Sequence, residues 1–325
     1  IDILFRVIHD GKVTDTVKSY FGMRKVSIEN GIFMLNNRPY YQKLLLDQGY
    51  WEESLLTAPN DEAFITDIRL AKEMGFNGVR KHQKIEDPRF LYHADKMGFI
   101  VWGEIPAAYK YSRKYVQRIT NEWIEEIFRD YNHPCILVWT PLNESWGVPN
   151  IMNKKNEQSH SAAMVYIAKS LDKTRPVISN DGWEHTCTDI LTIHDYEPRK
   201  QVLKDRYKSL ESILEAMPAG RKMFAQNWEY QNQPIMITEF GGISYQKSNW
   251  EGWGYSNATS DDDFAKRYHE VVSAILESPL IQGFCYTQIA DVEQEINGLL
   301  TYDRKPKIDP SIIRAINNGT WNPEK

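Results

Sequence analysis

The sequence has few cysteines, no excess of basic residues and no long apolar run. Its three cysteines, Cys135, Cys187 and Cys285, are far apart and form no Cys-x-x-Cys pair. This spacing argues against a disulfide framework or a zinc knuckle, and it favours reduced thiols and a cytoplasmic location. The net charge of −5 argues against nucleic acid or an anionic membrane as a partner. No apolar run approaches the roughly 18 to 20 residues that span a bilayer.

The sequence also lacks the usual signatures of a metal or cofactor site. The eight histidines form no His-x-His or His-Glu-x-x-His pair, which are common spacings of metal ligands. No Gly-rich nucleotide-binding fingerprint follows the first apolar run after Tyr40. The acidic run 261–263 is typical of a helix start, where carboxylates cap free N–H groups. We therefore expect neither a required metal nor a cofactor.

Length, apolar residues and aromatics are what the sequence does have. With 325 residues, of which 42% are hydrophobic, it can bury the core of one large domain. Ten tryptophans and eighteen tyrosines give a rich supply of aromatic faces. The chain opens at Ile1, without a methionine, in strand-like sequence. We therefore expect it to be part of a longer protein.

Residues 1–38 differ from the rest because they carry β-type residues and no helical period. The β-type stretches are Ile1–Val7 and Thr14–Ile28. Two turn pairs typical of hairpins follow, Asn30-Gly31 and Asn36-Asn37. We interpret 1–38 as the end of an upstream all-β domain with an entry hairpin, and 39–325 as the next domain.

After Tyr40 short apolar runs alternate with amphipathic stretches. About eight runs are candidate strands: Tyr41–Leu46, Gly78–Arg80, Ile100–Trp102, Ile136–Trp139, Val177–Ser179, Leu191–His194, Ile235–Thr238 and Ile281–Tyr286. The expected helices lie between and after them: Asp61–Met74, Pro88–Met97, Thr120–Asp130, Glu157–Leu171, Leu203–Ala216, Phe264–Glu277 and Ser311–Asn317. This alternation predicts an α/β fold, a closed (β/α)8 TIM barrel, rather than a doubly wound open sheet.

In such a barrel the functional side chains follow the strands, at the carboxyl end of the sheet. That rule selects polar and aromatic residues after successive strands: Asp47 to Trp51, Arg80 and His82, Glu104, Asn143 and Glu144, Asn180, Asp181 and Trp183, His194, Asp195 and Tyr196, and Glu239.

Glu144 and Glu239 stand out in this set because each ends an apolar strand. Hydrolysis of an acetal needs a proton on the leaving oxygen and a group that stabilises the oxocarbenium-like centre, and two carboxyl groups about 5–5.5 Å apart supply both. The structural alternative for either residue alone is a rim glutamate bonded to a neighbouring arginine. Both together favour a catalytic pair, with Glu144 as general acid/base and Glu239 as nucleophile.

Several short motifs in the same order resemble glycoside hydrolase family 2, the family of β-galactosidases, β-glucuronidases and β-mannosidases. The resemblance spans about residues 14–308. The motifs are Phe21-Gly-Met-Arg24, Asn77-Gly-Val-Arg80, Asn132-His-Pro134, Leu142-Asn-Glu-Ser145, Thr238-Glu-Phe-Gly241 and Gly298-Leu-Leu-Thr-Tyr-Asp-Arg304.

The resemblance implies roles for the residues near the two glutamates. Asn143 would hydrogen-bond the substrate 2-hydroxyl, and Tyr196 would hydrogen-bond the nucleophile Glu239. Arg80 would lie near Glu239 and keep it ionised, while a less polar setting would keep Glu144 protonated. Further substrate-binding candidates are His82, Asp181, Trp183, His194, Trp250, Trp253 and Gln288, and Glu104 has a supporting role.

Two departures from the family pattern bear on the sugar. Where many members place a tryptophan under the sugar, this chain has Thr287 followed by Gln288, and Trp250 or Trp253 would supply another face. The Glu-x-His pair with which large β-galactosidases hold a divalent ion is Glu104-Ile-Pro106 here. The resemblance also implies an upstream jelly roll and an immunoglobulin-like sandwich, of which residues 14–27 would be the end.

These observations predict a retaining hydrolase of terminal β-glycosidic bonds, with β-galactoside favoured. β-Glucuronidase is less favoured, because the sugar carboxylate is generally bound by an Asn-x-Lys segment and Asn249-Trp-Glu251 lacks the lysine. β-Mannosidase, arabinosidase and an endo-acting cellulase-like or mannanase-like barrel stay open, as does a non-catalytic carbohydrate-binding barrel. The expected partners are a carbohydrate and upstream β-sandwich domains of the same polypeptide, and a homo-oligomer stays open.

Overall fold

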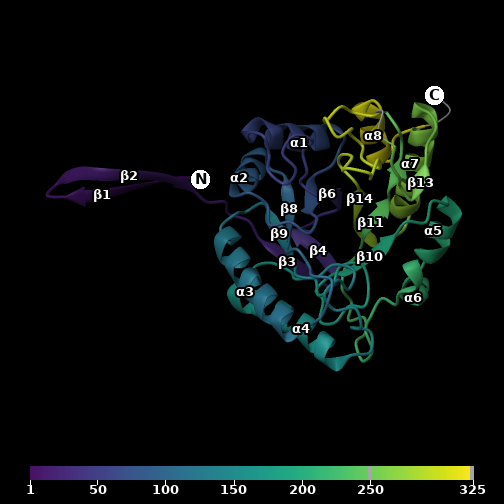
Figure 1. Cartoon of the computed structure of the whole chain (residues 1–325), viewed down its shortest axis with the longest axis horizontal. Helices are drawn as coiled ribbons and strands as arrows, with labels where there is room; N and C mark the ends of the chain where they lie inside the picture. The colour runs from purple at the N-terminus through teal and green to yellow at the C-terminus, as the bar shows by residue number, and fades with distance from the viewer. Residues whose placement is uncertain (248–250, 323–325) are drawn as a thin grey trace.

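The computed structural model, which describes residues 1–247 and 251–322, has a curled parallel sheet at its centre with helices around it (Figure 1). Seven strands form this sheet in the order β10-β11-β14-β6-β7-β8-β9. Their bounds are β6 Gln42–Asp47, β7 Gly78–Lys81, β8 Ile100–Glu104, β9 Ile136–Thr140, β10 Leu191–Asp195, β11 Ile235–Gly241 and β14 Ile281–Thr287. Nearly every residue of these strands is buried, as expected for a parallel sheet covered on both faces.

The helices cover the outside of the sheet. They are α1 Asp61–Glu73, α2 Pro88–Met97, α3 Arg113–Asp130, α4 Lys155–Leu171, α5 Lys200–Arg206, α6 Leu210–Glu215, α7 Asp261–Leu276 and α8 Pro310–Asn317, with the 3-10 turn Pro218–Gly220. Local sequence starts several of them: the Asn60 side chain accepts from Ala63 N before α1, and the Ser260 side chain accepts from Asp263 N before α7. None of the described helices is both long and apolar enough to cross a bilayer.

The predicted fifth strand, Val177–Ser179, is wrong in detail. The segment lies beside β9 and forms only isolated bridges, Trp139 with Val177 and Asn143 with Asp181. On its other side it bonds the loop before β10: Val177 N donates to the Asp189 carboxylate and Ser179 N to the Thr188 hydroxyl. The side chains of Asp189 and Thr188 accept hydrogen bonds that the backbone of a neighbouring strand would otherwise accept. Residues 177–181 therefore close the gap between β9 and β10 without a regular ladder.

Two expected helices also differ from the prediction. The helix expected over Leu203–Ala216 is interrupted, because the Tyr207 hydroxyl donates to Asp195 Oδ2 at 2.6 Å and Ser209 starts a new helix with a capping box. Helix α3 begins seven residues before the expected Thr120, at Arg113, where the Ser112 side chain accepts from Tyr115 N. In both places a single side-chain contact sets the helix end.

A small antiparallel sheet closes the amino end of the barrel. It consists of β3 Val26–Glu29, β4 Ile32–Leu35 and β5 Arg38–Pro39, joined by the expected turns, in which Asn30, Asn36 and Asn37 have positive φ. Phe33 is fully buried among side chains from the first halves of the barrel strands: Leu44, Ile100, Leu137 and Met236. The expected domain boundary at residues 38 and 39 stays a prediction, but β3–β5 pack as part of the barrel floor.

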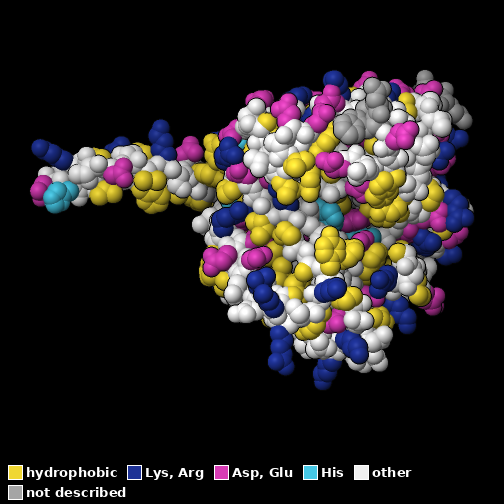
Figure 2. All heavy atoms as spheres, in the orientation of Figure 1, with side chains coloured by type: hydrophobic (Ala, Val, Ile, Leu, Met, Phe, Trp, Pro, Cys, Tyr) yellow, Lys and Arg dark blue, Asp and Glu magenta, His cyan; other side chains and the backbone are white. Residues whose placement is uncertain are grey.

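Strands β1 (Asp2–His9) and β2 (Lys12–Tyr20) form an antiparallel hairpin, here called the arm, that stands away from the body (Figures 1 and 2). Most of its side chains are exposed, including Phe5 and Val17. Its base is tied to the barrel, since the Tyr20 hydroxyl donates to Asp95 Oδ2 at 2.6 Å and Arg24 Nη2 to Ile136 O at 2.9 Å. The upstream immunoglobulin-like domain stays a proposal.

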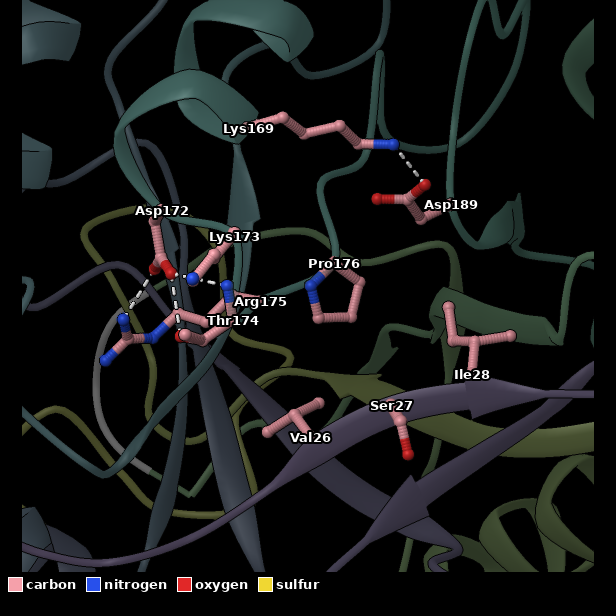
Figure 3. A pocket seen from close by; sticks show the side chains of 10 residues that line it. All are labelled: Val26, Ser27, Ile28, Lys169, Asp172, Lys173, Thr174, Arg175, Pro176 and Asp189. Carbon is pink, nitrogen blue, oxygen red and sulfur yellow. Dashed lines mark hydrogen bonds and ion pairs between the residues drawn. The ribbon is translucent and has the colours of Figure 1, made fainter.

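Two other features complete the fold. A hollow between β3 and the segment after α4 lies near the floor (Figure 3), where Arg175 Nη1 and Asp172 Oδ2 form a buried ion pair at 2.5 Å. The three cysteines are free, as the sequence predicts.

Candidate active site

The polar side chains selected from the sequence gather at the carboxyl end of the barrel. Since residues 177–181 fill the place between β9 and β10, the strands form a ring of eight positions in which β9 and β14 are opposite each other. Glu144 follows β9, Glu239 lies in β11 and Gln288 follows β14. The mouth of the barrel therefore has one wall at β9 and the opposite wall at β14.

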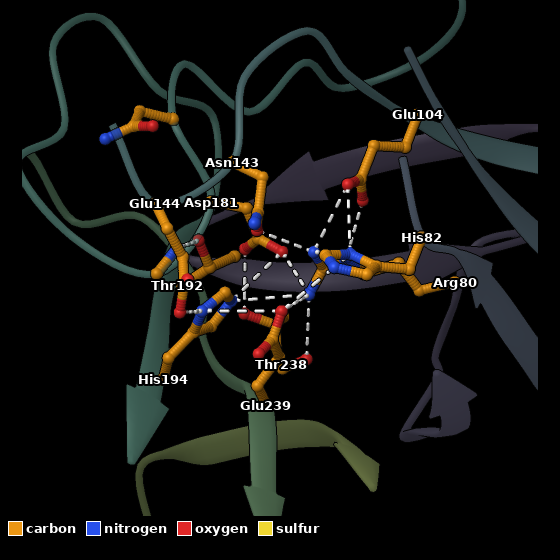
Figure 4. A network of polar contacts seen from close by, with 12 residues as sticks. Arg80, His82, Glu104, Asn143, Glu144, Asp181, Thr192, His194, Thr238 and Glu239 are labelled. Atoms are coloured by element: carbon orange, nitrogen blue, oxygen red, sulfur yellow. Dashed lines mark hydrogen bonds and ion pairs between the residues drawn. The ribbon is translucent and has the colours of Figure 1, made fainter. Parts of the chain in front are cut away.

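Arg80, at the end of β7, is the centre of the polar network (Figure 4). Its guanidinium is fully buried and pairs with Glu104 Oε2 at 2.7 Å, Asp181 Oδ2 at 2.7 Å and Glu239 Oε1 at 3.0 Å. It also donates to Asn143 Oδ1 at 2.7 Å. One cation thus positions three carboxylates and the side chain that precedes Glu144, an arrangement for which the fork of arginine donors is well suited.

Glu239 is held from two sides. Arg80 contacts Oε1, and the Tyr196 hydroxyl donates to Oε2 at 2.6 Å. The side chain is 6% exposed, so both oxygens are fixed while one edge of the carboxylate faces the mouth. A buried, doubly held carboxylate is suited to attack a carbon atom from a fixed direction.

Glu144 is more open and is held through its backbone. Its side chain is 25% exposed. Glu144 and Ser145 have φ of 51° and 61°, an unusual conformation for residues other than glycine. Bonds from Glu144 N to Asp181 O and from Ser145 N to Asn180 Oδ1, both at 2.9 Å, keep the backbone in this state. The strained turn aims the Glu144 carboxyl into the mouth.

His194 lies between the two glutamates. Its Nδ1 is 2.8 Å from Glu144 Oε1 and 3.5 Å from Glu239 Oε1, and its Nε2 is 3.3 Å from Asp181 Oδ2. The close approach requires Gly182, at which a Cβ would lie 2.6 Å from His194 Nδ1. One oxygen of each glutamate and the imidazole nitrogen all lie within 4.8 Å of one another. The two carboxyl groups therefore face a single gap.

The electrostatics differ from the sequence expectation at Glu144. Burial raises the pKa of Glu144, but the hydrogen bond and positive charge of His194 outweigh it and the net pKa is lowered. Burial would lower the pKa of His194, but the charges of Glu239 and Asp181 raise it to about 10. The expected less polar setting of Glu144 is thus wrong, because the imidazole of His194 lies beside the carboxyl group.

Two other expected residues, Glu104 and Asp181, contact Arg80 and do not face the gap between the two glutamates. Glu104 is fully buried and pairs with Arg80 and, at 3.1 Å, with His82 Nδ1; its supporting role stays a prediction. Asp181 is buried below the gap, and although burial alone would raise its pKa, the charges of Arg80 and His194 hold it well below the usual range.

Trp183 contacts His194 edge to face, with ring centroids 5.6 Å apart.

The remaining expected residues lie at the β14 side or beyond. Gln288 is fully buried and hydrogen-bonds Asn297 Oδ1 at 2.8 Å. Trp253 is 48% exposed and touches Tyr255. Asn249 and Trp250 lie outside the described residues.

Sequence reasoning missed three side chains at the mouth. Tyr255 stacks on Tyr196 with ring centroids 3.5 Å apart, and its pKa is raised by burial and by the charges of Glu239 and Glu144. Thr287, which we expected only to remove a stacking surface, has its hydroxyl 3.0 Å from that of Tyr196. Glu295 accepts from Gln48 and Gln288. Tyr255 and Glu295 lie well past the ends of the barrel strands β11 and β14, so the strand-end rule does not select them.

Among residues 1–247 and 251–322, two groups of side chains have atoms spaced as metal ligands could be. They are Glu144, His194 and Glu239, and Asp95, His133 and Cys135. In the first group His194 already contacts carboxylates on both sides, with Nδ1 2.8 Å from Glu144 Oε1 and Nε2 3.3 Å from Asp181 Oδ2. In the second group Asp95 Oδ2 already bonds His133 Nδ1 at 2.7 Å and the Tyr20 hydroxyl, which ties the arm to the barrel.

Comparison with curated proteins gives relatives that are longer than this chain. A β-glucuronidase of Streptococcus agalactiae is 24% identical over 92% of this chain and 53% of its own length. A β-galactosidase of Leuconostoc mesenteroides is 30% identical over 57% of this chain and 18% of its own. The chain thus spans about half the length of the first relative and less of the second.

Solved structures and family models agree on the fold. A β-galacturonidase from Eisenbergiella tayi bound to galacturonate superposes with a TM-score of 0.76 at 20% identity, over 95% of this chain and 56% of that one. The model of the glycosyl hydrolases family 2 TIM barrel domain matches residues 26–318. Because that model covers most of the sequence, the chain belongs to glycosyl hydrolase family 2 and contains its TIM barrel domain.

Proposed function

We propose that the chain is the catalytic barrel of a retaining β-glycosidase, with Glu239 as nucleophile and Glu144 as general acid/base. The observation that carries the proposal is the spacing of the two carboxyl groups, which have oxygens within 4.8 Å of each other. This separation suits direct attack on the anomeric carbon, whereas inverting enzymes keep about 6.5–9.5 Å for a water molecule. The two side chains also differ in exposure, 6% for Glu239 and 25% for Glu144, and this difference supports two different roles.

In this mechanism Glu239 attacks the anomeric carbon and forms a glycosyl ester while Glu144 protonates the leaving oxygen. Arg80 pairs with one oxygen of Glu239, and the Tyr196 hydroxyl fixes the second oxygen. Asn143, oriented by Arg80, would bond the sugar 2-hydroxyl, a contact that strengthens in the transition state.

Changes around Glu144 during the reaction explain how it can first donate a proton and later accept one. His194 lowers the pKa of Glu144, whereas a sugar that displaces water from the carboxyl group would raise it. When Glu239 becomes an ester its negative charge is lost, which lowers the pKa of Glu144 again and makes it a base for the incoming water. His194 stays charged and limits how far the pKa can rise.

The names of the relatives, β-glucuronidase, β-galactosidase and β-galacturonidase, support a β-glycosidase and leave the sugar open. We favour β-galactoside, with β-glucuronidase, β-mannosidase and arabinosidase as alternatives. The exposed apolar side chains of the arm support further β-sandwich domains as its packing partner. A carbohydrate-binding barrel without activity is the alternative from another class.

The test is proton NMR of the complete protein with a panel of aryl β-glycosides. Retention predicts that the β-anomer of the sugar appears first and mutarotates later. First appearance of the α-anomer would refute direct attack by Glu239. Cleavage of oligosaccharides without turnover of any monoglycoside would support an endo-acting enzyme, and binding without turnover would support the binding barrel.

A further inference from the structure

A third carboxylate, Glu295, lies on the wall of the mouth opposite Glu144. Its Oε2 accepts hydrogen bonds from Gln48 Nε2 at 2.6 Å and from Gln288 Nε2 at 3.1 Å. Gln48 directly follows β6 and Gln288 directly follows β14, and Gln48 Nε2 also lies 3.1 Å from Gln288 Oε1. Two amides from neighbouring strand ends therefore hold one oxygen of Glu295.

The other oxygen of Glu295 remains available. Within residues 1–247 and 251–322, Oε1 has no recorded hydrogen bond, and the side chain is only half-buried. The loop that carries Glu295 is fixed beside an exposed aromatic ring, because Trp253 N donates to Gln294 O at 2.8 Å and Ile296 N to Trp253 O at 3.1 Å. The carboxylate is thus held in place with one acceptor atom free.

Glu295 is close enough to the catalytic groups to sense their charges. Burial raises the pKa of Glu295, with a further rise from the charge of Glu239, and His82 acts in the opposite direction. The pKa of Tyr255, which is raised mainly by burial, is raised further by the charges of Glu239, Glu144 and Glu295 together. All three carboxylates therefore lie within electrostatic range of the Tyr255 hydroxyl.

The proposed mechanism fixes which part of a sugar meets this wall. Asn143 contacts the 2-hydroxyl and follows β9, so C2 of the ring faces the β9 side. In a pyranose ring C5 is opposite C2, and the strand opposite β9 is β14. The substituent on C5 therefore points to Gln288, Gln48 and Glu295.

On that basis, and resting on the function proposed above, we propose that Glu295 receives the C5 substituent of the sugar and selects an uncharged hydroxymethyl group over a carboxylate. A carboxylate oxygen accepts a hydrogen bond from the 6-hydroxyl, but it repels the carboxylate of a uronic acid. The described cations of the site, Arg80, His82 and His194, are already paired with carboxylates. None is left to offset the second negative charge.

The test uses ligand pairs that differ only at C6, measured on the complete protein. Kinetics compare aryl β-galactoside with β-galacturonide and aryl β-glucoside with β-glucuronide; calorimetry compares neutral iminosugars with their C6-carboxylate counterparts. We expect the wild type to favour the neutral member of a pair by about 100-fold or more in kcat/KM and in Kd, since juxtaposed like charges are strongly unfavourable. Equal or tighter binding of the carboxylate member would overturn the proposal.

The variant Glu295→Gln separates recognition from a structural role. It keeps the size and an acceptor oxygen but removes the charge, so the preference for the neutral member should fall by about 10-fold or more. A structural role would weaken both members equally and leave their ratio unchanged, which would also overturn the proposal. The ratio compares two ligands on one sample and does not depend on the folded fraction. Glu293→Gln, an exposed carboxylate of the same loop, is the matched control and should leave the ratio unchanged.

The calorimetric arm distinguishes this proposal from the proposed function. Selective binding of neutral iminosugars without hydrolysis of any glycoside would refute the catalytic role and leave the role of Glu295 supported. Hydrolysis of both members of a pair at equal rates would refute the role of Glu295 and leave the catalytic role supported.

Discussion

The two ends of the barrel are built from opposite kinds of side chain. At the mouth the buried groups are charged, with Arg80 and Asp181 fully buried and Glu239 nearly so. At the floor the buried cluster around Phe33 and Trp102 is mainly apolar, and the buried Arg175–Asp172 ion pair lies in the hollow beside β3. Apolar burial stabilises a fold by itself, whereas buried charges cost desolvation that their pairing only partly offsets. The floor therefore serves stability, and the mouth retains its charges for chemistry.

The largest expected change in activity is at Glu239, the proposed nucleophile at the mouth. Glu239→Gln should lower kcat/KM by about 10⁴-fold or more, because the ester can no longer form. The loss of stability should be small in comparison, because Arg80 keeps Glu104 and Asp181 as partners. Steady-state kinetics with an aryl β-glycoside and urea unfolding measure the two effects. Glu125→Gln, on the exposed side of α3, is the control and should change neither.

Asp181→Asn tests whether the mouth depends on paired charges. The change removes a carboxylate from both Arg80 and His194, and leaving buried cations short of a partner is expected to destabilise the protein by about 3–5 kcal/mol. Urea unfolding at neutral pH gives the value. A loss below about 1 kcal/mol would mean that the charges of the mouth are not energetically coupled as the distances indicate.

Phe33→Ala is the matching change at the floor. It should cost about 3 kcal/mol or more, because a cavity opens among the first halves of the barrel strands, while kcat per folded molecule stays the same. Ile32→Ala, on the exposed neighbour in β4 (41% exposed), should cost much less. If Phe33→Ala lowered kcat as strongly as it lowers stability, the separation of the two ends would not hold.

His194→Gln gives the smallest effect and tests the pKa of Glu144. Removing the charged imidazole should raise the pKa of Glu144, so the alkaline limb of the kcat/KM profile, which reports the acid in the free enzyme, should move to higher pH. An unchanged or acid-shifted limb would argue against Glu144 as the acid.

The same variant also has a defined effect on stability. The pKa of His194 is about 10 in the fold and about 6.5 in an unfolded chain. A raised pKa contributes stability that is fully present below the unfolded value and is lost as the pH rises through the folded value. The stability gap between wild type and His194→Gln should therefore be widest near pH 6 and narrow towards pH 10, as pH-dependent unfolding would measure.

The barrel and the two glutamates could be predicted from the sequence because both depend on local pattern. Apolar runs bury parallel strands, and the residue after such a run lies at the mouth, which was enough to select Glu144, Glu239 and Arg80. The pKa of Glu144 could not be predicted, since His194 approaches it from another strand through the space left by Gly182. Glu295 was missed because the loop after β14 decides where it lies.

The central claim is that two carboxyl groups meet across one sugar-sized gap and that Glu239 makes the covalent bond. Mass spectrometry of the complete protein after reaction with 2-deoxy-2-fluoro glycosides tests it directly, because the fluorine slows hydrolysis of the glycosyl ester. The account predicts one sugar attached per active site, on the peptide that contains Glu239, and none in Glu239→Gln. A sugar attached to Glu144, Glu104 or Glu295 instead would contradict it.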